Sequence, residues 1–451
     1  MNWFVYISVV LCFSTYEASS QYAVSQFDCG NESTVCIIGG DLYGTGSNSN
    51  NMLLAGDADA IALVKKLDSK MKWRMVACGS QHSLAIRSDG TLWSWGSNSY
   101  GQLGMDAEEA TSTPKMISSR TDWVSVSCGF AVSYAITSSG ELFGCGMNAF
   151  HQIANGGEKK ISELTQIGPK IYWNFVTVNG FHTLAISADS SLYGWGLNSV
   201  KQICDELADV IIEPKIITRG PVVSASAGFI HSLCVYANGS MWGWGSNISS
   251  QLGDEVENID AASMHQLGKG INWAKCEAGP MFSFGITVDG GLFGWGLNRD
   301  GQTGTGVKAE LVKTPTEVEH DCRWVTVSAS VGQIYNNLVF GSHALAMDER
   351  GRMYGAGVNY LGQLSQFVDC STDFKLIKYF EDGAPARKCA EATNKSNMVF
   401  HEGDNQLVFS GIGNCDSMHV SMYDIHGVTY ANGTCDCNGR MCINRDFEDS
   451  C

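Results

Sequence analysis

Residues 90–104 read GTLWSWGSNSYGQLG, and this pattern of aromatic residues, glycines, one asparagine and one glutamine returns along most of the chain. The copies read GELFGCGMNAFHQIA at 140–154, SSLYGWGLNSVKQIC at 190–204, GSMWGWGSNISSQLG at 239–253, GGLFGWGLNRDGQTG at 290–304 and GRMYGAGVNYLGQLS at 351–365, with a partial copy, DLYGTGSNSN, at 41–50. The second motif glycine falls at Gly46, Gly96, Gly146, Gly196, Gly245, Gly296 and Gly357, so the intervals are 50, 50, 50, 49, 51 and 61 residues. Self-similarity at a fixed period indicates a repeat architecture.

A second block precedes most copies, for example CGSQHSLAIRSDG at 78–90 and VNGFHTLAISADS at 178–190. The turn between the blocks is often Asp-Gly or Asn-Gly, which supplies the positive φ that tight hairpin turns need. The pattern therefore predicts that each repeat contains one hairpin and two shorter strands. Four strands per repeat predict the blades of a β-propeller. We expect the Gly-Trp-Gly strand to be the innermost one, because glycine lets crowded backbones approach near the axis.

These two blocks at fixed separation resemble the RCC1-like repeat, which defines the family of the regulator of chromosome condensation. The resemblance covers residues 29–400. It implies an all-β fold, a seven-bladed RCC1-like β-propeller, with eight blades as the alternative, and a short Cys-rich C-terminal extension. Family members usually close the ring by pairing two halves of a hairpin from the two chain ends. Here 41–48 would be the opening half and 389–400 the closing half.

The N-terminus has the pattern of a signal peptide. An apolar run at 3–13 is followed by Ala18 and Ser20, small residues at the positions that signal peptidase reads, so cleavage is expected before Gln21. We expect a signal peptide at 1–20, the propeller at 21–402 and the Cys-rich extension or ring-closing segment at 403–451. No later stretch approaches the roughly 20 apolar residues that span a bilayer. The expected location is extracellular or the lumen of the secretory pathway.

The cysteines fit an oxidising compartment, because 17 are present and 16 remain once Cys12 leaves with the signal. We expect Cys29 to pair with Cys36, and Cys370 with Cys389. The spacing in the tail favours disulfides over zinc. The disulfide candidates are Cys29, Cys36, Cys370, Cys389, Cys415, Cys435, Cys437, Cys442 and Cys451. Five N-x-S/T sequons predict glycosylated surface positions, at Asn31, Asn238, Asn247, Asn394 and Asn432.

Charge and motifs argue against several classes of function. The net charge of −17 opposes binding to nucleic acid or to anionic membranes. The sequence contains no motif typical of a catalytic or cofactor site. His82, His182 and His231 share one repeat position and would therefore lie in different blades, so we expect them to hydrogen-bond within their own hairpins and not to bind metal. We expect no enzyme activity, cofactor or metal.

The longest repeat interval contains extra residues at 331–341. Insertions in a strict repeat usually project from one face and often bind a partner. The candidate contacts are Gln333, Ile334, Tyr335, Leu338 and Phe340. The parent family implies a hairpin that engages a small GTPase, although no residue matches one by one. The alternative is an elongated hairpin packed on the disc.

Together these features predict a secreted, non-enzymatic protein-binding module that uses the loop faces of a rigid propeller. Acid-rich connectors, such as DEVENIDAAS at 254–263, favour a protein partner with a basic surface. The alternatives are guanine-nucleotide exchange on a small GTPase, which the resemblance implies, and an inhibitor of enzymes or a structural coat component. Sugar binding by the recurring tryptophans is a further alternative.

Overall fold

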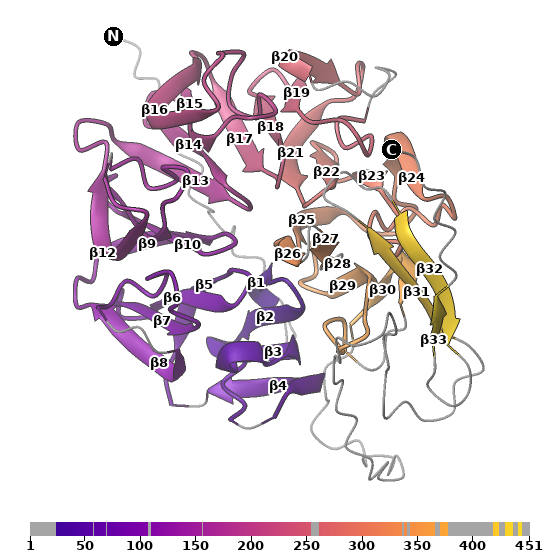
Figure 1. Cartoon of the computed structure of the whole chain (residues 1–451), viewed down its shortest axis with the longest axis horizontal. Coiled ribbons are helices and arrows are strands. Elements are labelled where there is room, and N and C mark those ends of the chain that lie inside the picture. Colours follow the sequence, from indigo (N-terminus) through magenta and orange to yellow (C-terminus); the bar gives the residue numbers. More distant parts are fainter. Residues whose placement is uncertain are drawn as a thin grey trace.

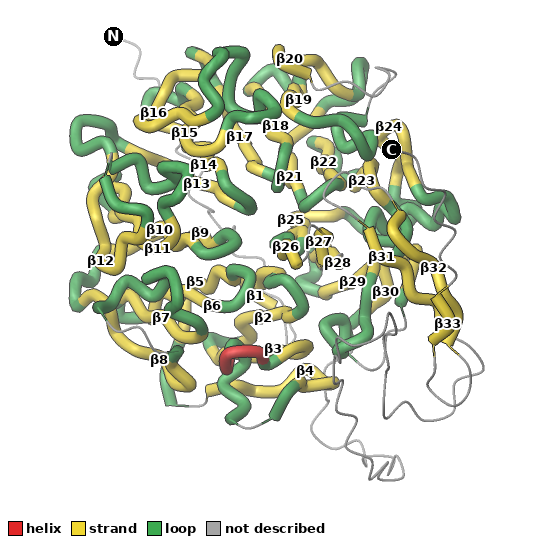
Figure 2. Tube along the Cα trace, viewed as in Figure 1, coloured by secondary structure: helices red, strands yellow, loops and turns green. Residues whose placement is uncertain are grey.

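A computed structural model describes residues 24–377, except 57, 69, 107–109, 156, 254–260, 336–337, 341–342 and 366–369. Only the backbone is described for 261–262, 333–335, 338–340, 418–423, 429–435 and 441–443. Seven four-stranded antiparallel sheets form a ring around a central axis (Figure 1). The fold is therefore a seven-bladed propeller and not an eight-bladed one. The described part is strand and loop apart from one short 3-10 helix, η1 (Ser49–Asn51) (Figure 2).

Each blade is a single stretch of chain whose four strands are hydrogen-bonded in sequence order, apart from the insertion in blade 7. The first four blades contain β1 (Val24–Cys29), β2 (Ser33–Ile38), β3 (Asp41–Ser47), β4 (Ala60–Asp68); β5 (Trp73–Cys78), β6 (His82–Arg87), β7 (Leu92–Gly96), β8 (Thr111–Ser118); β9 (Trp123–Cys128), β10 (Val132–Thr137), β11 (Leu142–Met147), β12 (Lys160–Ile167); and β13 (Trp173–Val178), β14 (His182–Ser187), β15 (Leu192–Leu197), β16 (Val210–Thr218). The last three contain β17 (Val222–Ala227), β18 (His231–Tyr236), β19 (Met241–Gly245), β20 (Ala261–Leu267); β21 (Trp273–Ala278), β22 (Phe282–Thr287), β23 (Leu292–Leu297), β24 (Leu311–Glu317); and β25 (Trp324–Ala329), β28 (His343–Asp348), β29 (Met353–Gly357), β30 (Ser371–Leu376).

The strands of a blade differ in how deeply they are buried. The second strands, such as β10 and β14, are buried at every residue because both of their faces pack on neighbouring blades. Their sequences, VSYAIT and HTLAIS, accordingly show little polar alternation. The outer strand β8 is only partly covered and contains several exposed residues. The first strands line a central cavity, and those of neighbouring blades contact each other.

The Gly-Trp-Gly strand is the third strand of its blade, so the expectation that it lies innermost is wrong. In blade 4, β15 lies between β14 and β16. Its Gly196 has a φ of +105°, and a Cβ there would lie 2.6 Å from the carbonyl oxygen of Phe181 on the way into β14. The motif glycine is therefore required by the positive φ and the close approach of the neighbouring strand, not by crowding at the axis.

The recurring tryptophans fill the space between blades. Trp73 and Trp95 have ring centroids 5.8 Å apart, and the pair Trp273–Trp295 repeats this contact at 6.0 Å. The indole nitrogen of Trp95 donates a hydrogen bond of 2.8 Å to the Met52 carbonyl of the preceding blade. These four rings are almost fully buried and tilted against each other in pairs, so an external sugar cannot stack on them.

The ring closes without strand exchange. Blade 1 is complete within residues 24–68, so 41–48 is the third strand of an intact blade with its adjoining residue and not the opening half of a shared one. The expected closing half at 389–400 lies outside the described residues. Blades 1 and 7 meet side by side at what we call the seam. There Thr45 Oγ1 donates a hydrogen bond of 2.6 Å to the Gly362 carbonyl, and the Val24 amide donates one of 3.2 Å to the Gly351 carbonyl.

Three further strands belong to the expected C-terminal extension. They are β31 (Met418–Tyr423), β32 (Thr429–Cys435) and β33 (Met441–Ile443), which form a separate antiparallel sheet. The seventh blade ends at Leu376, and the expected boundary at 402 lies outside the described residues, as do 1–20 and the cleavage position before Gln21. No helix in the described ranges is long and apolar enough to cross a membrane.

Candidate functional site

The polar residues of the repeat motif are engaged in their own loops. The Asn98 side-chain oxygen accepts the Leu103 amide at 2.9 Å, and Asn148 does the same for Ile153 at 2.9 Å. The Gln102 side-chain oxygen accepts the Tyr100 amide at 2.8 Å. These motif residues therefore shape the loop that follows the third strand, and this use accounts for their recurrence.

The repeated histidines connect neighbouring blades. His82 Nε2 lies 2.9 Å from Ser133 Oγ in the next blade, and His182 Nε2 lies 2.8 Å from Ser232 Oγ. The expectation that they bond within one hairpin is wrong, because the ring extends sideways into the adjacent blade. Burial lowers the pKa of His82 to about 4 and of His182 to about 3, so both are neutral at physiological pH. Within the described residues, no group of three His, Cys, Asp or Glu side chains could hold a metal ion.

The expected disulfide between Cys29 and Cys36 is not formed. Both are buried free thiols, and the strand register pairs Cys29 with Thr34 and Cys36 with Phe27. Burial raises the pKa of the Cys36 thiol to about 12, so it behaves as a small apolar side chain. Cys389, Cys415, Cys437 and Cys451 lie outside the described residues, and only the backbone of Cys435 and Cys442 is described. Those bridges, including that of Cys370 with Cys389, stay predictions.

The sequons divide by exposure. Asn31 and Asn247 are each only 2% exposed, so the expectation that they are surface glycosylation sites is wrong. Asn247 occupies the motif position and accepts the Leu252 amide at 2.9 Å, which explains its burial. Asn238 is exposed in a hairpin turn and stays a predicted site. Asn394 lies outside the described residues, and Asn432 lies on β32.

The axis of the ring contains a cavity of about 220 Å³. Its lining comes mainly from the first strands, with many Ser, Thr and Val side chains, and Asp28 and Glu277 are the charged residues among it. Asp28 accepts hydrogen bonds from Ser328 Oγ at 2.8 Å and from the Cys78 amide at 2.8 Å. This one carboxyl therefore connects blades 7, 1 and 2.

Glu277 connects blades 5, 6 and 7 in a similar way. Its Oε2 accepts Ser226 Oγ at 3.4 Å, and its Oε1 accepts the Ala329 amide at 3.3 Å. Burial raises the pKa of Glu277 to about 8, with a further contribution from the charge of Asp28. Burial likewise raises the pKa of Asp28 to about 6. The two carboxyls thus hold β25 from both sides, directly before the inserted segment.

Replacing Glu277 with glutamine is expected to stabilise the protein at alkaline pH relative to acidic pH. Between about pH 4.5 and 8 the Glu277 carboxyl is protonated in the folded protein but ionised in the unfolded chain. The free energy of unfolding therefore falls as pH rises through that window. Glutamine imitates the protonated form. Urea unfolding at pH 5 and pH 9 should show a relative gain of about 2–4 kcal/mol for the variant. The same change at exposed Glu317 should show none, and equal gains at both sites would contradict the assignment.

The inserted residues form a hairpin of their own. β26 (Gln333–Tyr335) pairs antiparallel with β27 (Leu338–Phe340), and the two make a separate sheet between β25 and β28. The five candidate contact residues all lie on these strands, with Gln333 opposite Phe340 and Tyr335 opposite Leu338. Val331, just before the hairpin, lines the axial cavity. The hairpin therefore begins at one end of the axis, and β26 lies near the centre of the ring (Figure 1).

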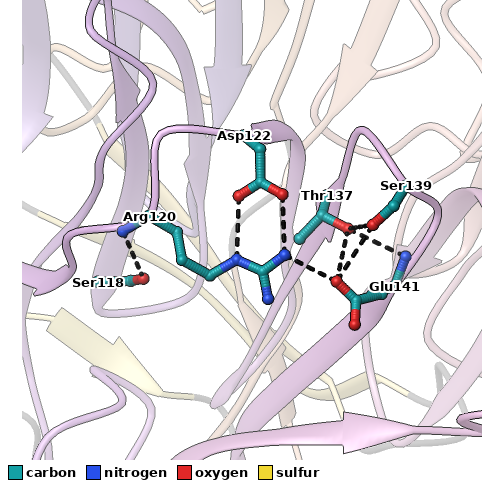
Figure 3. A network of polar contacts seen from close by, with 6 residues as sticks. All are labelled: Ser118, Arg120, Asp122, Thr137, Ser139 and Glu141. Carbon is teal, nitrogen blue, oxygen red and sulfur yellow. Dashed lines mark hydrogen bonds and ion pairs between the residues drawn. The ribbon is translucent and has the colours of Figure 1, made fainter.

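A network of charges lies at the opposite end of the blades, where fourth strands lead into first strands. Arg120 donates to Asp122 at 2.8 Å and to Glu141 at 2.7 Å, which joins the link from β8 to β9 with the β10–β11 turn (Figure 3). Its guanidinium also lies 5.5 Å from the Trp123 ring. The ion pairs raise the pKa of Arg120 and lower that of both acids. All three side chains are about one-third exposed or more, so we assign the network to local structure.

Sequence reasoning missed the two axial acids. Their repeat position is Asp28, Ala77, Ser127, Thr177, Ser226, Glu277 and Ser328 in the seven blades. A comparison of the first strands alone would have revealed both departures. The pattern of the chain does not show that this position faces the axis, so neither acid was a candidate.

Comparisons with known proteins agree with the architecture. The family model of the RCC1-like domain matches residues 17–338. The RCC2 homolog of Danio rerio is 34% identical over 121 residues, which are 26% of this chain and 22% of that protein. RCC2 of Homo sapiens is 37% identical over 79 residues, 18% of this chain and 13% of that protein. The chain thus matches about a fifth or less of the length of these relatives.

Solved structures show the same fold. Human WBSCR16 has a TM-score of 0.64 at 24% identity, covering 69% of this chain and 86% of that one. Prp20p of Saccharomyces cerevisiae has a TM-score of 0.66 at 19% identity, covering 79% and 88%. With seven blades built from the recurring motif, and with the family model matching well over half of its residues, this chain belongs to the RCC1-like domain family.

Proposed function

We propose that this protein is a secreted, non-enzymatic protein-binding module whose β26–β27 hairpin contacts the partner. The observation that carries the proposal is the hairpin itself, which interrupts blade 7 while the other blades follow the four-strand plan in the described residues. The motif residues of the repeats are engaged in holding loops and blades together. Residues added to the repeat are free of this structural role, so we assign the recognition of a partner to them.

Two further observations support a protein partner. The structure of Prp20p, which shares the fold, was reported with its binding properties to Gsp1p and histones. The present chain has a net charge of −17, which favours a partner with a basic surface and speeds its approach. Secretion is supported by the pattern of the first 20 residues.

Removing residues 333–340 is expected to leave the propeller folded and to abolish capture of the partner. The hairpin is a separate sheet, so its loss leaves the four-stranded sheet of blade 7 intact. The measurement is affinity capture from the secreted and surface proteins of the source organism, with the intact chain and the deletion compared. Tyr335→Ser should weaken capture at least tenfold, whereas Tyr172→Ser, at an aromatic residue that is 68% exposed at the opposite end of the blades, should not. Equal capture by the intact and deleted chains would contradict the proposal.

Guanine-nucleotide exchange is the second candidate, favoured by the shared fold and by a hairpin that begins at the axis. It predicts that the purified chain accelerates release of labelled GDP from a small GTPase, and that the deletion abolishes this effect. Mapping the mature N-terminus distinguishes the two proposals by compartment. A start at Gln21, with a glycan on exposed Asn238, supports secretion and argues against a cytosolic GTPase.

A further inference from the structure

The segment that leads into the hairpin is bound to a distant blade. Asn179, at the end of β13 in blade 4, donates from Nδ2 to the Ser330 carbonyl at 3.3 Å, and its Oδ1 accepts the Gly332 amide at 3.2 Å. Blades 4 and 7 are separated by two blades on one side of the ring and three on the other. These two hydrogen bonds therefore cross the axis.

Asn179 departs from the repeat at this position. The residues that follow the first strands are Gly30, Gly79, Gly129, Asn179, Gly228, Gly279 and Ser330. A glycine has no side chain to reach across the axis, and the ring is built with glycine at most of these positions. Asn179 is only 5% exposed, and both ends of its amide are used by the backbone of the inserted segment. Neither hydrogen bond is needed to build blade 4.

We infer that Asn179 is a positioning residue that fixes the base of the β26–β27 hairpin over the axis, so that blade 4 sets the direction in which blade 7 presents the hairpin. This inference deepens the proposed function and, for its effect on binding, rests on it. The hairpin needs such a support, because an isolated two-stranded hairpin is marginally stable in water. A base fixed in advance also lowers the ordering cost of association.

Packing around the base of the hairpin also holds the segment in place over the axis. Val331 is only 4% exposed and lines the axial cavity. A Cβ on Gly332 would lie 3.1 Å from the Phe229 ring and 3.2 Å from Pro280, so this glycine lies closely on blades 5 and 6. The segment 330–332 is thus held from three blades besides its own. The two hydrogen bonds between Asn179 and this segment depend on direction, so they fix its orientation as well as its position.

The first test uses amide hydrogen exchange and needs no partner. Asn179→Gly, which installs the residue common in other blades, should raise the exchange of residues 332–340 about tenfold or more, since two hydrogen bonds are lost. Asn179→Asp keeps the acceptor for Gly332 and loses the donor to Ser330, so it should fall between. The control is Asn174→Gly, the same change at an exposed residue of β13, the strand that Asn179 follows. It should leave exchange at 332–340 unchanged.

Thermal unfolding and exchange in the other blades show whether each variant is folded. Unchanged exchange at 332–340 in a folded Asn179→Gly variant would overturn the inference. If Asn179→Gly fails to fold, Asn179→Asp carries the test by the same criterion. Equal increases in Asn179→Gly and Asn174→Gly would also overturn it, because the effect would then come from any added glycine in or next to β13.

The second test separates this inference from the proposed function. With a captured partner, Asn179→Gly should weaken binding about tenfold in the intact chain and have no effect in the chain lacking 333–340. A loss in both backgrounds would show that Asn179 acts by another route and would overturn its role in binding. If the deletion itself leaves binding unchanged, the proposed function fails, while the exchange result still decides whether Asn179 fixes the hairpin.

Discussion

Replacing Leu345 with alanine is expected to lower the free energy of unfolding by about 2–5 kcal/mol and to open the ring at the seam. Leu345 lies on β28 with no exposed surface, in an apolar cluster that includes Phe27 and Ile38 of blade 1. The truncation removes buried methyl groups and leaves a cavity between the first and last blades. Because each blade is one stretch of chain, no shared sheet holds these two blades together.

Polar contacts also join the two blades at the seam. Beside the apolar cluster, Ser328 donates to Asp28, and the His343 ring lies 3.4 Å from Thr34 Oγ1. Every other junction also has a direct chain connection between its blades, whereas blades 1 and 7 lie at opposite ends of the propeller sequence. The seam therefore lacks the covalent link that limits separation at the other junctions. We expect the ring to open there first.

The matched control is Leu184→Ala. Leu184 holds the same repeat position on β14, is equally buried, and packs between blades 4 and 5. Both variants should lose similar stability in urea unfolding. Only Leu345→Ala should raise amide exchange selectively in β1, β2 and β28 below the global unfolding transition. Equal exchange patterns in the two variants would show that the seam is no weaker than an ordinary blade junction.

The repeat and its turns could be predicted from sequence because each follows from local chemistry. Glycines after Asp or Asn mark the hairpin turns, and Gly90 and Gly290 do adopt positive φ there. The radial order of the strands could not be predicted in this way. Second and third strands both read as apolar runs, and the first strand faces a narrow cavity lined by small polar residues.

Contacts between blades could not be predicted from the sequence either. The position of the His82 ring within its strand is clear from the repeat, but its hydrogen bond to Ser133 depends on how neighbouring blades are rotated. The same holds for Asn179, whose partners lie 151 and 153 residues away. The site at the base of the hairpin is assembled across the ring. The insertion itself could be located because it changes the repeat interval.

Replacing Gly196 with alanine is expected to destabilise the protein by about 3–5 kcal/mol, although only one methyl group is added. Its φ of +105° lies beyond the left-handed region that other residues tolerate, and the new Cβ would lie 2.9 Å from the His182 Cα as well as 2.6 Å from the Phe181 oxygen. Both neighbours are backbone atoms, one in the first residue of the paired strand and one in the residue before it, so a change of rotamer cannot relieve the contact.

Gly39→Ala separates the two contributions to this loss. Gly39 has a φ of +57° with nothing within 4 Å of its Cβ position, so its substitution should cost only about 1–2 kcal/mol of backbone strain. The excess at Gly196 then measures the steric part, which arises from the short distances between the new Cβ and the backbone at Phe181 and His182. Thermal and urea unfolding of the two variants provide the comparison. Equal losses would mean that β15 can move away from β14, and that the motif glycine recurs for its conformation alone.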